Sequence, residues 1–243
     1  MTDLTHIRLS EVDSTNNYLR ALASDHGADN VLVTADYQTA GRGSATNTWE
    51  SEPGRNILMS LLTHPTHIRP AHQFLLTECI SLAIRDALSG FAEGFTIKWP
   101  NDIYNKDKKV VGILIENRLT ASHIQDCIMG IGINVNQSRF TSPAPNPASL
   151  VQITGHEHDR DAIIARILSL YHHYLTFTLD GREAQLHDCY LAHLYRRGVE
   201  ADYEDALGPF RATLTTVLPS GHLVLTDIAG RERRYEFKEV KFK

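Results

Sequence analysis

The fold is decided by a stretch that reads Asp36-Tyr37-Gln38-Thr39-Ala40-Gly41-Arg42-Gly43-Ser44-Ala45-Thr46-Asn47-Thr48-Trp49. It places an arginine between two glycines, and a tryptophan follows six residues after the second glycine. Glycines let backbone N–H groups approach a ligand closely and permit positive φ. Arg42 adds a permanent cation whose planar fork of donors suits a carboxylate or a phosphate. The stretch therefore predicts a loop that holds an anionic small molecule, although a hairpin tip with incidental charge has the same composition.

The segments on either side of this loop both read as strands. Residues 31–35 form a short β-prone run before the loop, and residues 56–62 form a buried apolar run after the Pro53-Gly54 turn. A dinucleotide-binding fingerprint and a P-loop both lead from a strand into a helix. A loop between two strands therefore argues against both of these nucleotide-binding folds.

The rest of the chain mixes helical and strand patterns. Apolar residues at helical spacing predict helices at residues 75–88 (closed by Gly90), 163–175 and 186–194, with another after the N-cap signal of Ser14. Further strands are expected at residues 95–99, 110–116, 124–134, 211–218, 222–226 and 233–237. We expect residues 1–195 to form the main domain and residues 196–243 a small SH3-like β-barrel packed on it.

Composition limits the classes of partner. The 243 residues carry a formal net charge of −5, so no basic field favours nucleic acid. No apolar run reaches the about 18 residues of a membrane span, and the N-terminus does not resemble a signal peptide. The three cysteines are odd in number and far apart, which argues against a disulfide framework and favours the cytoplasm.

Thirteen histidines raise the possibility of a metal site. None of them lies in an H-E-x-x-H or a Cys/His ligand pattern. His64 and His67 flank Pro65 in an expected loop, and His172 and His173 are adjacent in a helix. We interpret them as surface or rim residues and predict no resident metal site.

Three further blocks carry chemically useful residues. Lys98-Trp99-Pro100-Asn101-Asp102 ends a strand with a cation and two polar side chains, although Pro-Asn-Asp is also ordinary turn chemistry. Lys109 enters the next strand, whose interior glycine, Gly112, suggests close approach by a ligand or another backbone. Gly130-Ile131-Gly132-Ile133-Asn134 leaves one face of a strand as bare backbone, on which a flat ligand or a crossing strand could lie.

In this order, and together with Asp13-Ser14-Thr15-Asn16, these motifs resemble the biotin protein ligases, also called biotin–acetyl-CoA-carboxylase ligases. The resemblance is strong over residues 12–136 and looser beyond. It implies an α+β fold, a mixed β-sheet with flanking helices like that of class II aminoacyl-tRNA synthetases. Some members carry a DNA-binding domain in front; Ser14 comes too early to leave room for one, so we expect a monofunctional enzyme that does not bind DNA.

The resemblance also implies a reaction in two steps. Biotin and ATP form biotinyl-5′-AMP with the help of Mg²⁺, and a lysine of a biotin carboxyl carrier protein then accepts the biotin. Both first substrates are anions, so fixed cations are required. The residues expected to act in catalysis are Arg42, Lys98, Lys109 and Asp102.

Carried over by motif, two sets of binding residues follow from the resemblance. Residues expected to bind biotin are Ser14, Thr15, Asn16, Gln38, Gly41, Arg42, Lys109, Gly112 and Gly132. Residues expected to bind ATP or the adenylate are Gly43, Ser44, Trp49, Asn101 and Asn134.

Two features leave alternatives open. Residues 44–47 lack the basic side chains that many family members carry after the second glycine, so a weak or inactive biotin-binding protein is one alternative, and weaker retention of the adenylate is another consequence. A lipoate or octanoate ligase shares the fold, but Lys98-Trp99-Pro100-Asn101-Asp102 favours biotin. The chain is expected to be a monomer, or a homodimer paired through a strand edge within residues 124–134.

Overall fold

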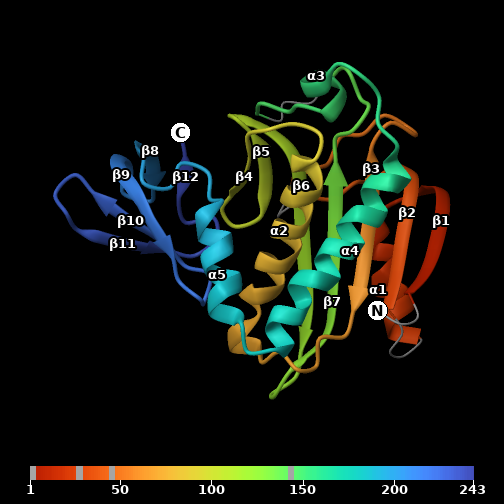
Figure 1. Ribbon diagram of the computed structural model, residues 1–243, viewed down its shortest axis with the longest axis horizontal. Coiled ribbons are helices and arrows are strands. Elements are labelled where there is room, and N and C mark those ends of the chain that lie inside the picture. The colour runs from red at the N-terminus through yellow and green to blue at the C-terminus, as the bar shows by residue number, and fades with distance from the viewer. Residues whose placement is uncertain (1–3, 26–29, 44–46, 142–144) are drawn as a thin grey trace.

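The computed structural model describes residues 4–25, 30–43, 47–141 and 145–243. Its larger sheet has the strand order β1-β2-β3-β7-β6-β5-β4. These strands are β1 (Leu4–Val12), β2 (Asn30–Gln38), β3 (Ile57–Thr63), β4 (Phe95–Lys98), β5 (Asp102–Asn105), β6 (Lys108–Leu119) and β7 (Ile124–Ile133). β1 pairs with β2 in parallel, and the other neighbours are antiparallel. The expected mixed sheet is therefore confirmed (Figure 1).

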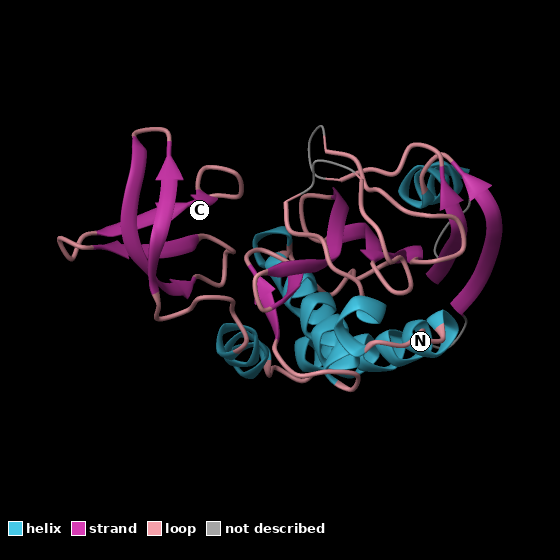
Figure 2. Cartoon of the chain, turned by 90° about the horizontal axis from the view of Figure 1, so that it is seen from above, coloured by secondary structure: helices cyan, strands magenta, loops and turns pink. Residues whose placement is uncertain are grey.

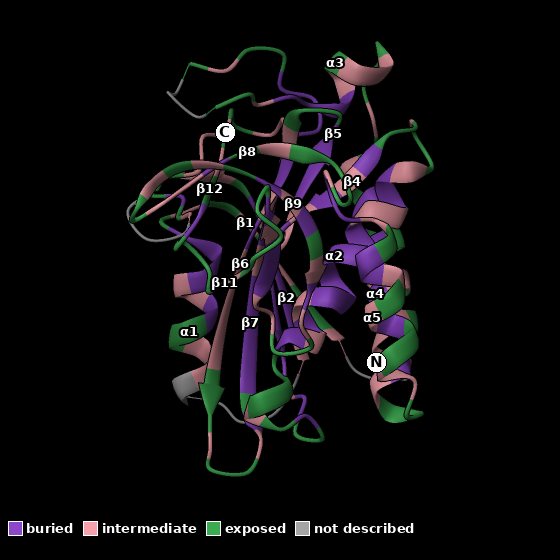
Figure 3. Cartoon of the chain, turned by 90° about the vertical axis from the view of Figure 1, so that its left-hand side faces the viewer, coloured by how far each residue is buried: buried purple, intermediate pink, exposed green. Residues whose placement is uncertain are grey.

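Helices cover both faces of this sheet. They are α1 (Thr15–Asp25), α2 (Phe74–Ser89), α3 (Leu150–Thr154), α4 (Arg160–Leu179) and α5 (Glu183–Ala192), with a short 3₁₀ turn η1 (Pro70–His72). Figure 3 shows α1 on one side of the sheet and α2, α4 and α5 on the other. β3 lies between the two helical layers, which is why every one of its residues is buried and its sequence is a continuous apolar run.

The main core lies between the sheet and α2. The apolar stripe of α2 is fully buried and packs with α4 and the sheet. Gly90 follows the last helical residue, as expected from the sequence. A smaller cluster around Leu19 fills the space between α1 and the opposite face. No helix among the described residues is long and apolar enough to cross a membrane.

One expectation about assembly is wrong. β7 is hydrogen-bonded to β3 on one side and to β6 on the other, so it offers no free edge for pairing with a second copy. The edge strands of the sheet are β1 and β4. The sequence pattern could not show this, because a central strand and an edge strand have similar composition when both are apolar.

The C-terminal segment forms a second sheet with the order β11-β10-β9-β8-β12. Its strands are β8 (Glu200–Asp205), β9 (Gly208–Val217), β10 (Leu223–Asp227), β11 (Glu232–Tyr235) and β12 (Lys241–Phe242). This sheet is open, since no pairing joins β11 to β12 in the part of the chain that the structure describes, and closure into an SH3-like barrel is not confirmed. Figure 2 shows it beside the larger sheet, and Trp99 Nε1 donates to the Gly221 carbonyl across the gap at 2.9 Å.

A buried ion pair between α2 and α5 gives stability a pH dependence. Glu78 is 1% exposed, and its Oε1 lies 2.6 Å from Nδ1 of His187. The carboxylate raises the pKa of His187 above its ordinary value of 6.5, and burial raises the pKa of Glu78. A raised histidine pKa contributes stability that is complete below about pH 6.5 and is lost as pH rises through the folded value.

We therefore predict that the free energy of unfolding falls as pH rises from about 6.5 through the raised pKa of His187. Glu78→Gln removes the carboxylate, which is the largest cause of the raised pKa of His187, so most of this fall disappears. Urea unfolding of both proteins across this range measures the effect. An equal fall in both would contradict the assignment to this pair.

Candidate functional site

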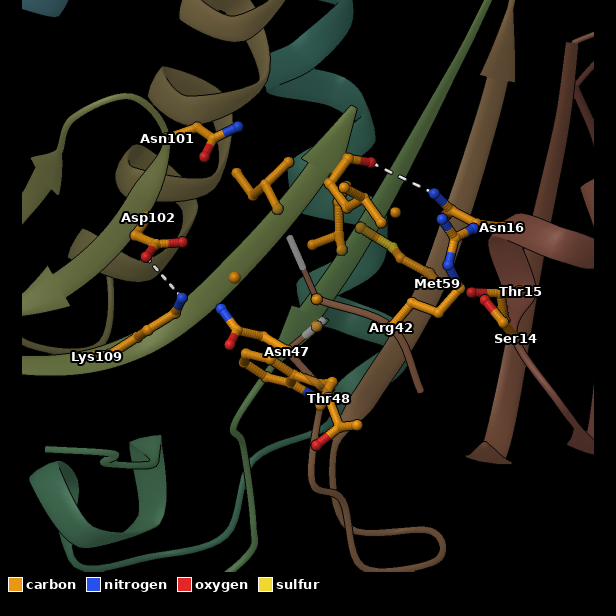
Figure 4. Close-up of a pocket in the computed structure, with 18 of the residues that line it drawn as sticks. Ser14, Thr15, Asn16, Arg42, Asn47, Thr48, Met59, Asn101, Asp102 and Lys109 are labelled. Carbon is orange, nitrogen blue, oxygen red and sulfur yellow. Dashed lines mark hydrogen bonds and ion pairs between the residues drawn. The ribbon is translucent and has the colours of Figure 1, made fainter. Parts of the chain in front are cut away.

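A pocket lies where the loop after β2 meets α1, β6, β7 and the turn between β4 and β5 (Figure 4). Its walls come from six sequence segments and from Phe237, which lies between β11 and β12. The lining residues are Ser14, Thr15, Asn16, Gln38, Arg42, Gly43, Asn47, Thr48, Trp49, Met59, Trp99, Pro100, Asn101, Asp102, Lys109, Gly112, Ile113, Leu114, Gly130, Ile131, Gly132 and Phe237. The structure therefore brings most of the residues predicted from the motifs into one cavity.

The N-terminus of α1 forms a polar end of the pocket. Gln38 Oε1 accepts hydrogen bonds from the backbone N–H of Thr15 at 2.8 Å and from its hydroxyl at 3.0 Å. The chain after β2 runs beside the start of α1, with Thr39 N–H donating to the Val12 carbonyl. Ser14, Thr15 and Asn16 are buried there. This end offers paired donors and acceptors to a small polar ring.

Arg42 stands on a loop that is tied at its base. Gly43 N–H donates to the Asn47 carbonyl at 2.7 Å, and Trp49 N–H donates to the Gly41 carbonyl at 2.9 Å. A Cβ at Gly41 would lie 2.8 Å from the Trp49 carbonyl oxygen, so the glycine is needed for this closure although it does not line the pocket. Ser44, predicted to contact the adenylate, lies outside the described residues, as do Ala45 and Thr46.

The Arg42 guanidinium is held by two partners. Nη1 donates to Asn17 Oδ1 at 3.0 Å, and Nη2 donates to Glu116 Oε1 at 3.1 Å. The arginine keeps further N–H donors and remains partly exposed at the pocket. It can therefore bind an anion in exchange for part of this pairing.

Lys109 and Asp102 form an ion pair on the opposite wall, with Lys109 Nζ 2.6 Å from Asp102 Oδ2. Both side chains are about two-thirds buried, at 30% and 28% exposed. The backbone of Lys109 is fixed by the segment after β7, because its N–H donates to the Asn146 carbonyl and its carbonyl accepts from Ala148 N–H. Figure 4 shows Asn101 close to Asp102 on the same turn. The pocket thus has one cation on each side.

The bare face of β7 is filled by two side chains of the protein itself. A Cβ at Gly132 would lie 2.4 Å from Cε2 of Trp49, and one at Gly112 would lie 2.7 Å from its Cζ3. Gly112 and Gly132 face one another in the β6–β7 register. A Cβ at Gly130 would lie 2.2 Å from Oδ1 of Asn16. These glycines make room for Trp49 and Asn16, where a ligand was expected to lie directly on the backbone.

Lys98 is not among the residues that line the pocket, and its expected part in catalysis stays a prediction. Its Nζ donates to the Tyr104 hydroxyl at 3.2 Å and lies 4.8 Å and 5.2 Å from the ring centroids of Tyr104 and Phe242. Burial lowers the pKa of Lys98, although nearby Asp102 opposes the shift. The side chain instead contacts the last strand of the C-terminal sheet.

The expected contact of Asn134 with the adenylate also stays a prediction. Asn134 is buried at the end of β7, outside the pocket lining, and its Nδ2 donates to the Ala148 carbonyl at 3.1 Å. Its amide therefore holds the segment that in turn fixes Lys109. Sequence reasoning missed Ser60 and Glu116, which support Asn16 and Arg42 from behind. The available signal was a serine inside the apolar run of β3 and a glutamate at the end of the apolar run of β6.

Comparison with known proteins agrees with this geometry. Residues 9–134 match the biotin/lipoate A/B protein ligase family. The chain is 36% identical over 174 residues to the bifunctional ligase/repressor BirA of Bacillus spizizenii, which covers 68% of this chain and 53% of that protein. The match therefore spans about half the length of that relative.

Two other matches cover nearly the whole chain. The biotin–[acetyl-CoA-carboxylase] ligase of Paracoccus denitrificans is 28% identical, over 92% of this chain and 95% of that protein. The structure of a biotin protein ligase from Aquifex aeolicus in complex with biotin and ATP has a TM-score of 0.82 and 25% identity, over 100% of this chain and 99% of that one. The α+β fold of the described residues is thus similar to that of a biotin protein ligase.

The close packing of the Trp49 indole on Gly132 can be tested by adding one methyl group to the glycine. Gly132→Ala must displace the indole, which we predict costs about 1–3 kcal/mol of folding free energy and shifts tryptophan emission to the red. Gly90→Ala is the matched control, since its Cβ meets only the Ala87 carbonyl at an ordinary 3.5 Å. Thermal unfolding and fluorescence measure both. Unchanged emission in Gly132→Ala would show that Trp49 does not depend on this glycine.

Proposed function

Because the chain belongs to the biotin/lipoate A/B protein ligase family, we propose that it is an ATP-dependent biotin protein ligase. One observation carries this proposal. A polar end formed by Thr15 and Gln38 and two cations, Arg42 and Lys109, line the same pocket. A ligand with a polar ring at one end and a carboxylate at the other matches this arrangement.

In the first step a carboxylate oxygen of biotin attacks the α-phosphorus of ATP. The new O–P bond forms as the bond between the α-phosphorus and the bridging oxygen breaks, and pyrophosphate leaves. Two anions must meet, so Arg42 and Lys109 neutralise charge at the reacting groups. Orientation of the two substrates supplies up to roughly 7–11 kcal/mol of the barrier reduction. No covalent bond to the enzyme is required.

In the second step the amine of an acceptor lysine attacks the carbonyl carbon of biotinyl-5′-AMP. The amide C–N bond forms, the C–O bond to the phosphate breaks, AMP leaves with the bonding electrons, and the nitrogen loses one proton to water. Asp102 and Asn101 lie on the pocket wall, where they are positioned to guide the incoming amine. The proposed acceptor is a biotin carboxyl carrier protein.

Mg²⁺ accompanies the triphosphate in this proposal. The carboxylate of Asp102 and the amide oxygen of Asn101 are donors that this ion accepts, and Mg²⁺ needs only one or two protein ligands beside phosphate oxygens and water. When bound it neutralises charge on the phosphates. Asp102 and Asn101 would hold the ion, and Lys109, whose Nζ lies 2.6 Å from Asp102 Oδ2, would remain beside them.

The binding roles proposed for the other residues follow the pocket. Ser14, Thr15, Asn16 and Gln38 contact the ring of biotin, while Gly41, Gly112 and Gly132 act indirectly through Trp49. Trp49 offers its buried Nε1, which has no partner among the described residues, to the ligand. Gly43 and Asn101 remain proposed contacts of the adenylate.

The proposal also includes the domain division, the location in the cell and the oligomeric state. The chain divides into a catalytic domain of residues 1–195 and a C-terminal domain of residues 196–243 that is SH3-like in its short antiparallel strands. The protein is proposed to act in the cytoplasm, in keeping with the free thiols of Cys79, Cys127 and Cys189. It acts without DNA, as a monomer or as a homodimer that does not pair through β7.

The proposed chemistry predicts a large effect at Lys109. Lys109→Ala removes a cation from the pocket, and we expect biotin-dependent pyrophosphate release and biotin transfer to a carrier domain to fall by at least about 100-fold. Lys108→Ala is the matched control, because Lys108 is the exposed neighbour in the same strand. A normal rate for Lys109→Ala would contradict the assignment.

The same assay separates the alternatives. Pyrophosphate release by the wild-type chain with biotin, and not with lipoate or octanoate, supports the proposed enzyme. Release with lipoate instead would replace it with a lipoate ligase. Biotin binding without release would leave a binding protein that has lost catalysis.

A further inference from the structure

We propose that Glu116, which does not line the pocket, is a positioning residue that makes the pocket select a ring carrying N–H donors. It does so by fixing the direction of a chain of hydrogen bonds through Asn16, Ser60 and Thr15. The inference rests on the proposed function, since biotin supplies the ring with its two N–H groups.

The carboxylate of Glu116 sets the orientation of Asn16. Its Oε2 accepts from Asn16 Nδ2 at 2.9 Å, and its Oε1 accepts from Nη2 of Arg20 at 2.5 Å and of Arg42 at 3.1 Å. Partial burial raises the pKa of Glu116, but the Asn16 amide and the two guanidiniums outweigh it, so the pKa lies below its ordinary value. An ionised carboxylate only accepts, so the NH₂ group of Asn16 must face it.

The amide oxygen of Asn16 therefore points the other way, over Gly130. It lies 2.6 Å from Oγ of Ser60, which is fully buried on β3. Ser60 Oγ lies 2.7 Å from Thr15 Oγ1, and Thr15 Oγ1 lies 3.0 Å from Gln38 Oε1. Four oxygen atoms thus form a chain with three close contacts.

This chain of four oxygen atoms has one proton too few for its three contacts. Gln38 Oε1 is also fixed as an acceptor, because the Thr15 backbone N–H donates to it at 2.8 Å. Both ends of the chain are carbonyl oxygens, which only accept, and the two hydroxyls between them carry one proton each. Three contacts share two protons, so one oxygen–oxygen contact lacks a hydrogen bond.

The contact that lacks a proton lies beside the pocket, where the ligand is proposed to bind. Thr15, Asn16 and Gln38 line the pocket, so a ring N–H placed against them donates the missing proton. A ring oxygen in the same place brings no proton and competes for the two hydroxyl protons that the four oxygens already share, and an unmatched buried polar pair is a strong source of specificity. The polar end of the pocket therefore accepts hydrogen bonds more than it donates them.

Glu116→Gln reverses this polarity with almost no change in shape. Arg20 and Arg42 need an acceptor, so the amide oxygen of Gln at this position stays toward them and its NH₂ group faces Asn16. Asn16 then turns and donates to Ser60 Oγ, which supplies the missing proton. The turn costs Asn16 only a long contact to the Leu114 carbonyl, at 3.5 Å.

Calorimetry on the full chain tests this with biotin and with its cyclic carbamate analogue, in which one ring N–H is replaced by oxygen. We expect the wild-type chain to prefer biotin by at least about 10-fold and Glu116→Gln to lose most of that preference. Asn16→Ala removes one accepting end of the hydrogen-bond chain, so that two contacts remain for two protons. It is expected to lose the preference for biotin in the same way, and it replaces Glu116→Gln should that variant fail to fold. Asp126→Asn is the matched control, a carboxylate on β7 that pairs with Arg118 and His64 and not with Asn16.

The possible results separate the two proposals. If the wild-type chain does not bind biotin, the proposed function and this inference both fail. If it binds biotin, the inference is overturned by any of three results: no preference in the wild type, equal weakening of both ligands in Glu116→Gln, or a lost preference in Asp126→Asn. Each of these three leaves the proposed ligase intact.

Discussion

The site depends on the absence of side chains along one face of two paired strands. Gly130 and Gly132 lie on the same face of β7, and Gly112 of β6 is in register with Gly132. Asn16 and Trp49 occupy the space that these glycines leave. One comes from α1 and the other from the loop after β2, so a single stretch of bare backbone brings both segments to the pocket. Any side chain there would separate the helix, the loop and the sheet.

The cations of the pocket are each held by a carboxylate of the protein. Arg42 is paired with Glu116, and Lys109 with Asp102. These pairs keep the side chains ordered and partly neutralised, and an arriving carboxylate or phosphate exchanges with them. Because the two carboxylates are fixed on β6 and at the start of β5, the charges remain near the reacting groups after the exchange. Such an arrangement suits a reaction in which positioning and charge neutralisation do most of the work.

Much of this could be read from the sequence, and the failures have physical causes. Long apolar periodicity located α2, α4 and α5, and the motifs located most of the pocket. β1 was missed because it is an edge strand with polar residues throughout, and β5 because it starts at Asp102, within a Pro-Asn-Asp stretch that is typical of a turn. Lys98 does not line the pocket, because successive side chains of a strand point to opposite faces and the motif alone does not show which face meets the pocket. Ser60 and Glu116 act through other residues, so no pattern of ligand-binding residues includes them.

The glycines of β6 and β7 leave room for Trp49 and Asn16, and the ligand is proposed to bind against those two side chains. A crystal structure with biotinyl-5′-AMP tests it most directly. The predicted result has Trp49 on Gly112 and Gly132 and Asn16 on Gly130, with the ligand's ring against Thr15 and Gln38 and its phosphate between Arg42 and Lys109. A ligand lying directly on the glycines, with the indole displaced, would contradict it.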